Sequence, residues 1–532
     1  MSIAPKQVPA VIIANPSEIK SVQNPTRRLS IVREFCLNTS THALPGIARS
    51  NSIHNRLFWL FSFVTFTGIM VYFIVAAILA YFSYPTDVDI NIVSEWQQYF
   101  PAVSVCNFAP MRLDLFYEAY INFTVVNNLT KPNASITSTY NIQNLGSFAG
   151  YTLNNNKTLD KYFFSLETML YSCTFNNQPC STLDFISFTS SYFGSCYTFN
   201  AKLKSNKSRD LKYANQYGGE GVLELEFYIH SHQYVPNIFS GKSINYFTDD
   251  AYFLKLFPLL FDLGYGMMAL VHDNTQLPLI EKAGICLATG RKHKLGYRKK
   301  TNYFLSPPYT ACTDKVSTMM AAMFDNYAGA DYQYSESICF QLCGQVYAYE
   351  QCECVNPYLW SGRSILKTRT SDELFLAPIC EITDVCYPKA LDTLMASPDL
   401  LKMYCPDCLP QCSITHFIVQ KSAFSAPNDW QMENLKAFVE NSSVPLTSNW
   451  STTWQQDIVK NYIGLVIMRE TNIVENNTQS AKMGIVDVLS NIGGQTGLWI
   501  GISFLSIMEL IEMIYRLIRH EIYSFAHRIS NR

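Results

Sequence analysis

The chain has 532 residues and a formal net charge of −2, with 40 Lys and Arg against 42 Asp and Glu. This near balance gives no electrostatic reason to expect a nucleic-acid partner. The mean hydropathy of +0.02 is too low for a protein with many membrane spans, and it fits a mostly water-exposed protein with a few apolar segments.

The first long apolar run extends from Leu57 to Phe82, over 26 residues without a charged side chain. A hydrocarbon core of ~30 Å needs about 20 helical residues, so this run is long enough to span a membrane. It begins too late and is too long for a secretory signal peptide. It also lacks the polar face of a buried soluble helix. The run therefore predicts a transmembrane helix over residues 57–82.

A second run, over residues 484–517, contains ionisable side chains that an ordinary lipid-facing anchor would avoid, namely Asp487, Glu509 and Glu512. Such residues usually face an aqueous path or the interior of a bundle. If the run is one helix, small residues recur every three or four positions on one face: Ser490, Gly494, Gly497 and Gly501.

Two interpretations of this face remain open. G-x-x-x-G spacing, which begins at Gly493, is typical of close helix packing. A pore lining is the alternative, because backbone freed around Gly501, Ile502 and Ser503 could coordinate a partly dehydrated cation. One helix cannot enclose a pore, so a pore requires several copies around an axis.

The charges that flank the two runs predict their orientation. Residues 1–56 carry seven Lys or Arg against Glu18 and Glu34, and the tail from Arg516 onward carries four Arg against Glu521. Positive flanks stay on the cytosolic side. We therefore expect cytosolic ends over 1–56 and 518–532, and an extracellular domain over 83–483, in a multi-pass protein of the cell membrane.

Fifteen of the 16 cysteines lie between Cys106 and Cys412. This density indicates an oxidising compartment and a disulfide framework. Metal binding at Cys352-x-Cys354 or Cys405-x-x-Cys408 is the alternative, and the absence of paired histidines in 312–412 disfavours it. Glycosylation sequons agree with an outward-facing segment and begin at Asn122, Asn128, Asn133, Asn156, Asn206, Asn441, Asn449 and Asn476.

Strand-like patterns over 221–231 and 264–273, together with helical patterns near 313–327 and 428–440, indicate a mixed α+β extracellular domain.

Several separated motifs resemble the degenerin/epithelial sodium channel superfamily, which includes acid-sensing and peptide-gated channels. They are Phe100-Pro-Ala-Val-Ser-Val-Cys-Asn107 with Pro110 and Arg112, then His272, Pro278, Gly290, Pro307-Pro308-Tyr309 and Cys312, the ordered cysteines up to Cys412, and Leu489-Ser-Asn-Ile-Gly-Gly-Gln-Thr-Gly-Leu-Trp-Ile-Gly-Ile-Ser503.

The resemblance implies a trimer in which two transmembrane helices join a large extracellular domain. That domain would have a β-sheet palm, a β-ball and helical finger, thumb and knuckle parts. The implied disulfides are Cys106–Cys196, Cys173–Cys180, Cys312–Cys412, Cys339–Cys408, Cys343–Cys405, Cys352–Cys386 and Cys354–Cys380. Cys286 has no partner in this scheme, and we expect it to be a buried free thiol unless it bridges to another chain.

The resemblance also implies roles along the second run. Gly501, Ile502 and Ser503 would form the selectivity filter. Ser490 would lie where bulky residues hold family channels open, near the amiloride site, with Asp487, Gly494 and Gly497 along the pore or gate. The sequence departs from the family at a His-Gly gating motif, because His42 is followed by Ala43. Alanine does not readily adopt the positive φ that glycine allows, so Gly46 could take this role instead.

The function implied is an amiloride-sensitive sodium channel, modulated by a ligand or by protons, that conducts sodium into the cell. Its partners would be sodium ions, two further copies or homologous subunits, membrane lipid, and an extracellular peptide or protons as the stimulus. A two-span receptor or adhesion subunit without a pore is the alternative. We expect no enzyme, cofactor or metal, since no G-x-S-x-G or H-E-x-x-H motif is present and His272-Asp273 has no triad context.

Overall fold

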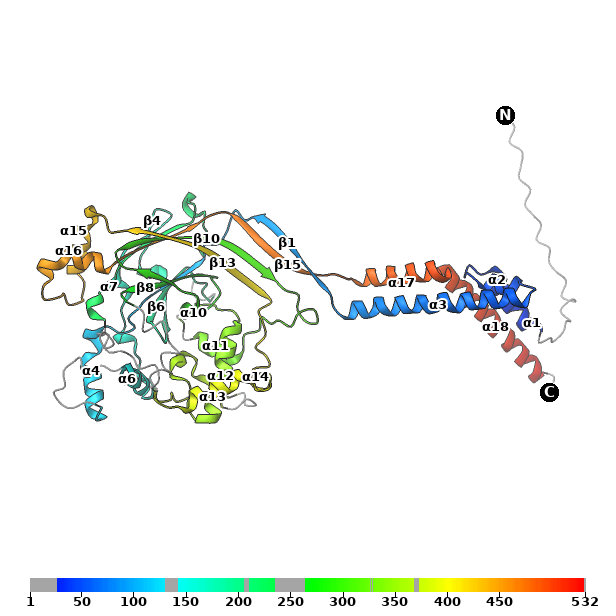
Figure 1. Cartoon of the computed structure of the whole chain (residues 1–532), viewed down its shortest axis with the longest axis horizontal. Coiled ribbons are helices and arrows are strands. Elements are labelled where there is room, and N and C mark those ends of the chain that lie inside the picture. Colours follow the sequence, from blue (N-terminus) through cyan, green and yellow to red (C-terminus); the bar gives the residue numbers. More distant parts are fainter. Residues whose placement is uncertain are drawn as a thin grey trace, which may run out of the picture. The chain divides into compact units, whose positions relative to one another are not determined.

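The computed structural model describes residues 26–129, 142–204, 210–234, 264–325, 327, 329–367 and 373–530. The chain divides into two compact units. The helical unit combines Met1–Asp87 with Ala481–Arg532, and the sheet unit is Val88–Ser480. Figure 1 labels the elements of both units.

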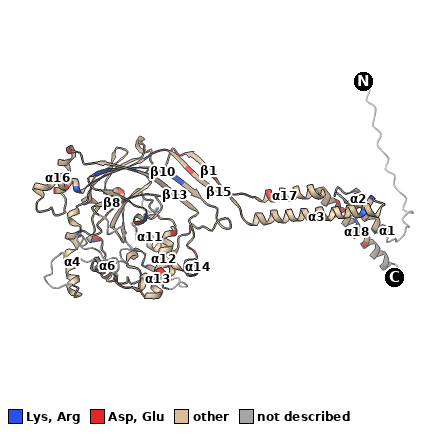
Figure 2. Ribbon diagram, viewed as in Figure 1, with Lys and Arg blue, Asp and Glu red and all other residues tan. Residues whose placement is uncertain are grey.

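The helical unit contains α1 (Thr26–Asn38), α2 (Leu44–Arg49), α3 (Ile53–Phe82), α17 (Ile485–Ile500) and α18 (Phe504–Ser530). By length and composition, α3 can cross a membrane. Large apolar side chains are exposed along it, such as Phe61 at 74% and Leu79 at 65%. Figure 2 shows almost no charged residue on the α3 ribbon. A helix that is apolar all round is stable only in an apolar environment.

The second apolar run, over 484–517, does not form one continuous helix. The run is split into α17 and α18, and the two helices are bent by 71° at the break. The cause is Gly501, which has φ 69° and ψ 21° and ends α17 in the left-handed conformation. Glycine at this position commonly terminates helices because it has no Cβ to oppose a positive φ. Only together do α17 and α18 have the length and composition of a span.

The sheet unit contains an eight-stranded sheet. Along it run β1 (Thr86–Ser94), β15 (Ile473–Ala481), β10 (Arg291–Tyr303), β14 (Tyr462–Arg469), β7 (Val222–Tyr228), β3 (Leu170–Phe175) and β4 (Gln178–Pro179). The eighth strand, β13 (Ser413–Ser425), pairs antiparallel with the whole of β10. The opposite edge of β10 pairs parallel with β14 and then with β15.

A second sheet has five strands in the order β5 (Phe185–Ser190), β6 (Gly194–Phe199), β2 (Ala102–Asn107), β8 (Gly266–His272) and β9 (Ile285–Ala288). Alternate residues of both sheets form one apolar core. On β7, for example, Leu223, Leu225 and Phe227 are fully buried. This period of two is the pattern of strands that cover a core on one face. A two-stranded sheet pairs β11 (Ser364–Leu366) with β12 (Leu374–Leu376).

Helices complete the sheet unit. They are α4 (Leu113–Val126), α6 (Ile142–Asn154), α7 (Leu166–Met169), α10 (Ile280–Ala283), α11 (Thr318–Asp325), α12 (Glu336–Cys352), α13 (Cys386–Ala396), α14 (Pro398–Tyr404), α15 (Met432–Glu440) and α16 (Trp450–Asn461). Short 3-10 turns are η2 (Asp160–Tyr162), η3 (Thr182–Asp184), η4 (Gln216–Gly218), η5 (Ser231–Gln233), η6 (Pro357–Gly362) and η7 (Asp429–Gln431). The predicted mixture of strands and helices is confirmed.

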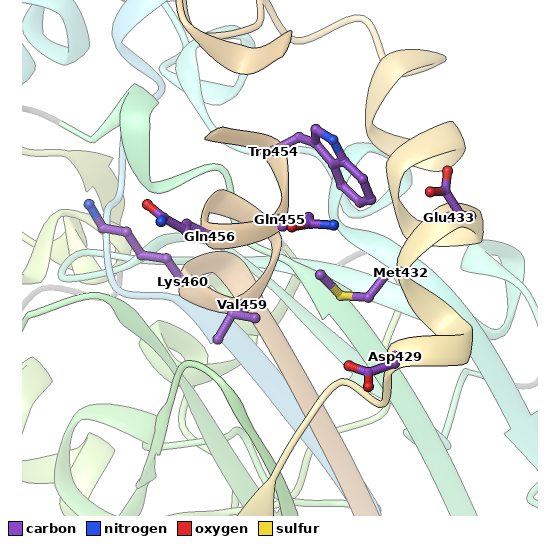
Figure 3. Close-up of a pocket in the computed structure, with 8 residues that line it drawn as sticks. All are labelled: Asp429, Met432, Glu433, Trp454, Gln455, Gln456, Val459 and Lys460. Carbon is purple, nitrogen blue, oxygen red and sulfur yellow. The ribbon is translucent and has the colours of Figure 1, made fainter. Parts of the chain in front are cut away.

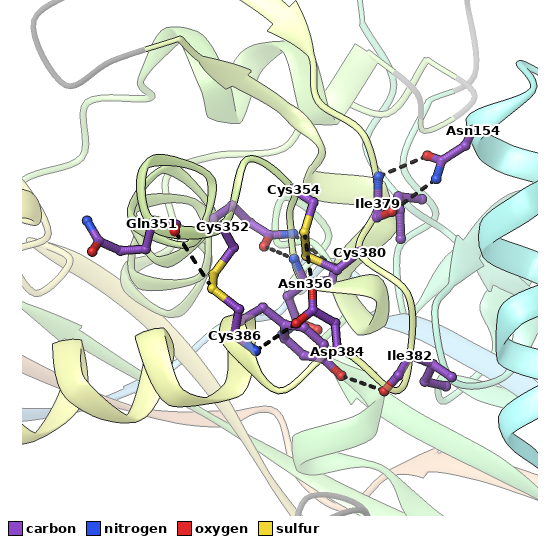
Figure 4. The surroundings of a disulfide bond; sticks show 12 residues. Asn154, Gln351, Cys352, Cys354, Asn356, Ile379, Cys380, Ile382, Asp384 and Cys386 are labelled. Carbon is purple, nitrogen blue, oxygen red and sulfur yellow. Dashed lines mark hydrogen bonds between the residues drawn. A yellow bond between two sulfur atoms is a disulfide. The ribbon is translucent and has the colours of Figure 1, made fainter.

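The sheet unit holds seven disulfides, the same pairs that the family resemblance implied. Figure 4 shows two of them, Cys352–Cys386 and Cys354–Cys380, where the end of α12 meets the start of α13. Beside them the Asn154 side chain donates to the Ile379 carbonyl at 3.0 Å and accepts from its N–H at 2.9 Å. All cysteines of the C-x-C and C-x-x-C motifs are in these bridges, so none offers a free thiolate to a metal.

The expectation that Cys286 is buried is wrong. Cys286 is a free and exposed cysteine. It lies on β9, which is an edge strand of the five-stranded sheet. The remaining free cysteine in the described residues is Cys36 on α1, which is partly buried.

Candidate functional site

Helix α17 has two different faces. One face packs on α3, where the Trp499 ring stacks between Phe66 and Phe73, with ring centroids 5.9 and 6.1 Å away. The indole N–H of Trp499 donates to Gln495 one turn earlier at 2.7 Å. This aromatic contact fixes which side of α17 faces α3.

The other face carries the small and polar residues predicted to line a pore. Asp487, Ser490, Gly494 and Gly497 are all exposed. They follow one another at steps of three, four and three, so they share one side of the helix. A Cβ added at Gly494 or Gly497 would meet nothing within 4 Å. Among the residues that the structure describes, none packs against the stripe at Gly494 or Gly497.

Asp487 also has a local structural role at the start of α17. Its carboxylate accepts a hydrogen bond from the Gly484 N–H at 2.8 Å. An acidic side chain in the first turn satisfies a free N–H and interacts favourably with the helix dipole. Capping of the helix is enough to explain an acidic residue at this position. Asp487 also lies on the exposed stripe, but its presence in the sequence does not by itself indicate a pore.

The predicted filter residues form the non-helical link between α17 and α18. The Gly501 N–H donates to the Gly497 carbonyl and the Ile502 N–H donates to the Thr496 carbonyl, each at 3.2 Å. On the far side, the Ser506 hydroxyl accepts from the Ser503 N–H at 3.0 Å. These bonds hold the irregular backbone of the link in a fixed geometry.

The segment that precedes the first span packs against this link. The His42 N–H donates to the Ile500 carbonyl at 2.8 Å. An added Cβ on Gly501 would lie 2.9 Å from the His42 ring. Only glycine fits between them, so the structure brings the predicted gating motif and the predicted filter together.

Two serines that the sequence did not single out complete this contact. The Ser40 and Ser506 hydroxyl oxygens are 2.5 Å apart, and the Ser40 N–H donates to Glu509 at 3.2 Å. Glu512, by contrast, pairs with Arg516 on its own helix at 2.6 Å. Ser506 lies one helical turn after Ser503, and this spacing could have identified it from the sequence. Nothing in the sequence pointed to Ser40.

Ala43 adopts the positive φ that alanine was expected to avoid. Its φ is 71° and its ψ is −32°. Gly46 does not replace it, because Gly46 lies inside α2, where an added Cβ would be 2.7 Å from the Trp59 ring. Gly46 is therefore needed for close packing, and the strained position remains at Ala43.

Replacing Ala43 with glycine is expected to stabilise the helical unit by ~1 kcal/mol, because a non-glycine residue in a sparsely populated backbone region costs about 1–3 kcal/mol. The measurement is the thermal midpoint of the purified full chain. Ala48→Gly on α2 is the matched control and is expected to lower the midpoint, since glycine inside a helix is unfavourable. If the A43G and A48G variants shift the thermal midpoint in the same direction, the backbone at Ala43 is not strained.

The sheet unit has a cavity of about 660 Å³ between α15 and α16. Figure 3 shows its lining, which includes Trp454, Met432 and Asp429. The Trp454 ring already has the Lys436 ammonium 4.7 Å from its centroid. The lining mixes two acidic side chains, Asp429 and Glu433, with Lys460 and with apolar side chains, and this mixture indicates no particular ligand, so we assign no function to this cavity.

The chain was compared with known proteins. A family model described as amiloride-sensitive sodium channel matches residues 35–513. Degenerin-like protein asic-2 of Caenorhabditis elegans is 24% identical, over 91% of this chain and 86% of its own length. Acid-sensing ion channel 1 of Gallus gallus is also 24% identical, over 92% and 85%.

The bile acid-sensitive ion channel of Homo sapiens is 21% identical, over 93% of this chain and 88% of its own length. The match to the family model extends from α1 through both sheets and all seven disulfides to α18. It also contains the whole contact between His42 and the link at Gly501. The chain therefore belongs to the amiloride-sensitive sodium channel family, whose members are ion channels and not enzymes.

Proposed function

We propose that three copies of this chain, or this chain with homologous subunits, form an amiloride-sensitive, sodium-selective channel of the cell surface. Residues 57–82 and 484–517 cross the membrane, 1–56 and 518–532 are cytosolic, and 83–483 are extracellular. In this assignment the eight-stranded sheet is the palm and the five-stranded sheet is the β-ball, with the helices as finger, thumb and knuckle. A stimulus from outside, an extracellular peptide or protons, opens the channel.

The observation that carries this proposal is the exposed stripe of α17. Its other face is occupied by α3 of the same chain, through Trp499. The stripe therefore turns toward the equivalent stripes of the other subunits around a closed axis. Asp487 gives that surface a negative end that attracts cations, and Ser490 lies one turn further along.

Selectivity is proposed to reside at Gly501, Ile502 and Ser503. Carbonyl and hydroxyl oxygens replace part of the hydration shell of a cation, provided that the backbone is held in place. The His42 N–H bond to Ile500 and the serine contacts hold it. In this proposal His42 and Ala43 control the filter from the cytosolic side.

The test is whole-cell current from Ser490→Phe, compared with wild type, in cells that express this chain alone. A bulky side chain on the proposed pore wall is expected to hold the channel open, which gives a steady inward sodium current without knowledge of the stimulus. The current should fall on addition of amiloride and on replacement of external sodium.

Leu489→Phe is the matched control, since Leu489 is exposed on α17 but lies about 100° around the helix from Ser490 and off the stripe. It is expected to give no steady current. Surface protein without current in Ser490→Phe would argue against a pore built from this chain alone. Equal currents in both variants would argue against the assignment of the pore wall.

The buried histidines of the sheet unit bear on the stimulus. Burial lowers the pKa of His272, and separately that of His230, to about 4. Both rings therefore stay neutral near neutral pH, and they supply no charge change there. A proton stimulus would therefore have to act on other groups, such as carboxylates.

Glycan occupancy tests the extracellular assignment. Of the predicted sequons, Asn122, Asn128, Asn156, Asn441 and Asn449 are exposed, whereas Asn133 and Asn206 lie outside the described residues. Asn476 differs, because its side-chain oxygen accepts from the buried Thr301 hydroxyl within the β10–β15 pair. We expect Asn441→Gln to remove one glycan from the surface protein and Asn476→Gln to leave its mass unchanged, as measured by gel shift with glycosidase. A glycan lost in Asn476→Gln would mean that this strand pair is absent.

A further inference from the structure

Several side chains of the sheet unit have buried polar atoms without a hydrogen-bond partner among the described residues, and Gln98, Tyr297 and Arg469 are three of them. Gln98 and Tyr297 are both fully buried. Neither the amide nitrogen nor the amide oxygen of Gln98, nor the Tyr297 hydroxyl, has a partner among the described residues. The same is true of the buried Nη1 of Arg469. Unpaired groups of this kind are rare in interiors because a buried polar atom without a partner loses the hydrogen bonds that it made to water.

These three side chains converge on one place. Tyr297 on β10 lies directly opposite Arg469 on β14 in the parallel register, so the two side chains are on the same face of the sheet. The Phe100 ring packs edge-on against the Tyr297 ring at 5.7 Å between centroids. The segment that holds Gln98 and Phe100 is extended and bonded to residues 212–214. Gln98 therefore points to the same side as Phe100, toward Tyr297.

Two further observations place the Arg469 charge beside the phenol. Burial raises the pKa of the Tyr297 hydroxyl well above its usual value, while the nearby charge of Arg469 lowers it and that of Glu95 raises it. An added Cβ on Gly221 would lie 3.4 Å from the Arg469 Cβ and 2.9 Å from Ala214. The Ala214 N–H in turn donates to the Gln98 carbonyl at 2.9 Å.

The positive side chains around Tyr297 outnumber the negative side chains that pair with them. Lys299 has its own carboxylate, since its ammonium lies 2.9 Å from Glu95. Arg298, on the other face of β10, has Glu470 at 2.6 Å. Arg469 forms no ion pair with any residue that the structure describes. A partly buried positive charge without a counter-charge is strongly unfavourable.

Donors also exceed acceptors. Arg469 Nη1 and Gln98 Nε2 each carry two hydrogens, and the Tyr297 hydroxyl carries one. The acceptors in the cluster are the Gln98 amide oxygen and the phenol oxygen, and they cannot use all of these hydrogens. The cluster therefore needs an additional acceptor, and the uncancelled charge of Arg469 favours one that is negative.

We propose that Arg469, Gln98 and the Tyr297 hydroxyl form an internal binding site for a small monovalent anion of the size of chloride. Arg469 supplies the charge, and the amide and phenol supply neutral donors. The anion links the edge of the core at Gln98 to β10 and β14. It thereby stabilises the sheet that leads into β15 and the second apolar run.

The test is the thermal midpoint of the purified full chain in sodium chloride and in sodium gluconate at equal ionic strength. Chloride binds the folded state, so the wild-type midpoint is expected to be at least ~2 °C higher in chloride. Arg469→Gln is expected to lose this difference. Arg298→Gln, which removes a paired charge from the neighbouring position, is expected to keep it.

Equal wild-type midpoints in the two salts would overturn the proposal, because a cluster satisfied by water alone does not distinguish them. A difference that persists unchanged in Arg469→Gln would also overturn it, since it would then be a general salt effect. If Arg469→Gln does not fold, Gln98→Leu is the second variant and is expected to reduce the chloride response while leaving the arginine in place.

Discussion

Replacing Gly501 with alanine is expected to reduce the sodium current by about 5–30-fold through the backbone alone. Gly501 has φ 69°, and an L-residue in this region costs about 1–2 kcal/mol. The added Cβ would also lie 2.9 Å from three atoms of the His42 ring, closer than real contacts of this kind. Both effects displace the link between α17 and α18, which holds the proposed filter.

The measurement uses Ser490→Phe as the background, because this variant is expected to conduct without a stimulus. Current and surface protein are recorded with and without Gly501→Ala. Gly68→Ala on α3 is the matched control, since a Cβ there meets nothing within 4 Å of the chain. If Gly501→Ala and Gly68→Ala carry equal currents at equal surface density, the link does not determine conduction.

The pore interpretation singled out the backbone at Gly501, but helical periodicity alone does not distinguish Gly501 from its neighbours. Periodicity places Ser490, Gly494, Gly497 and Gly501 on one helix face, and treats the glycines alike. In the structure Gly494 and Gly497 have open space, whereas Gly501 ends the helix and contacts His42. A contact between residues this far apart in the chain has no local signal, so the helix pattern continued past the true end of α17.

At Ala43, the local backbone preference of the residue does not predict the conformation that the structure shows. Local preference says that alanine avoids a positive φ, and the structure gives it one. The surrounding contacts account for this, because the His42 N–H is tied to Ile500 on one side and Gly46 is packed against Trp59 on the other. Tertiary contacts thus override the preference of a single residue. The first span and the mixed strand and helix content were predictable, because they depend on long local patterns.

Removing the Cys106–Cys196 disulfide is expected to destabilise the sheet unit more than removing any single bridge of the cysteine ladder. The two cysteines lie directly opposite each other on β2 and β6, and both are fully buried. The two cysteines are 90 residues apart in the sequence. The Cys173–Cys180 bridge lies inside this loop but spans only seven residues, so it shortens the loop very little. A bridge that closes such a long loop restricts the unfolded chain by ~4–5 kcal/mol.

The ladder behaves differently because its bridges are nested. Cys343–Cys405 lies immediately inside Cys339–Cys408. With the outer bridge intact, the inner one closes only the short loop of a few residues between the two pairs. The expected cost of its removal is therefore ~2–3 kcal/mol, even though its own separation is 62 residues.

The comparison is made with paired alanine variants, Cys106→Ala with Cys196→Ala against Cys343→Ala with Cys405→Ala, by the amount of mature protein at the cell surface and by thermal midpoint. Cys286→Ala is the control, since this thiol is free and exposed. The Cys106–Cys196 variant should show the larger loss in both measurements, and Cys286→Ala should match wild type. A larger loss from the ladder pair would mean that packing around those sulfurs, which form a small buried cluster with Cys408, contributes more than loop closure does.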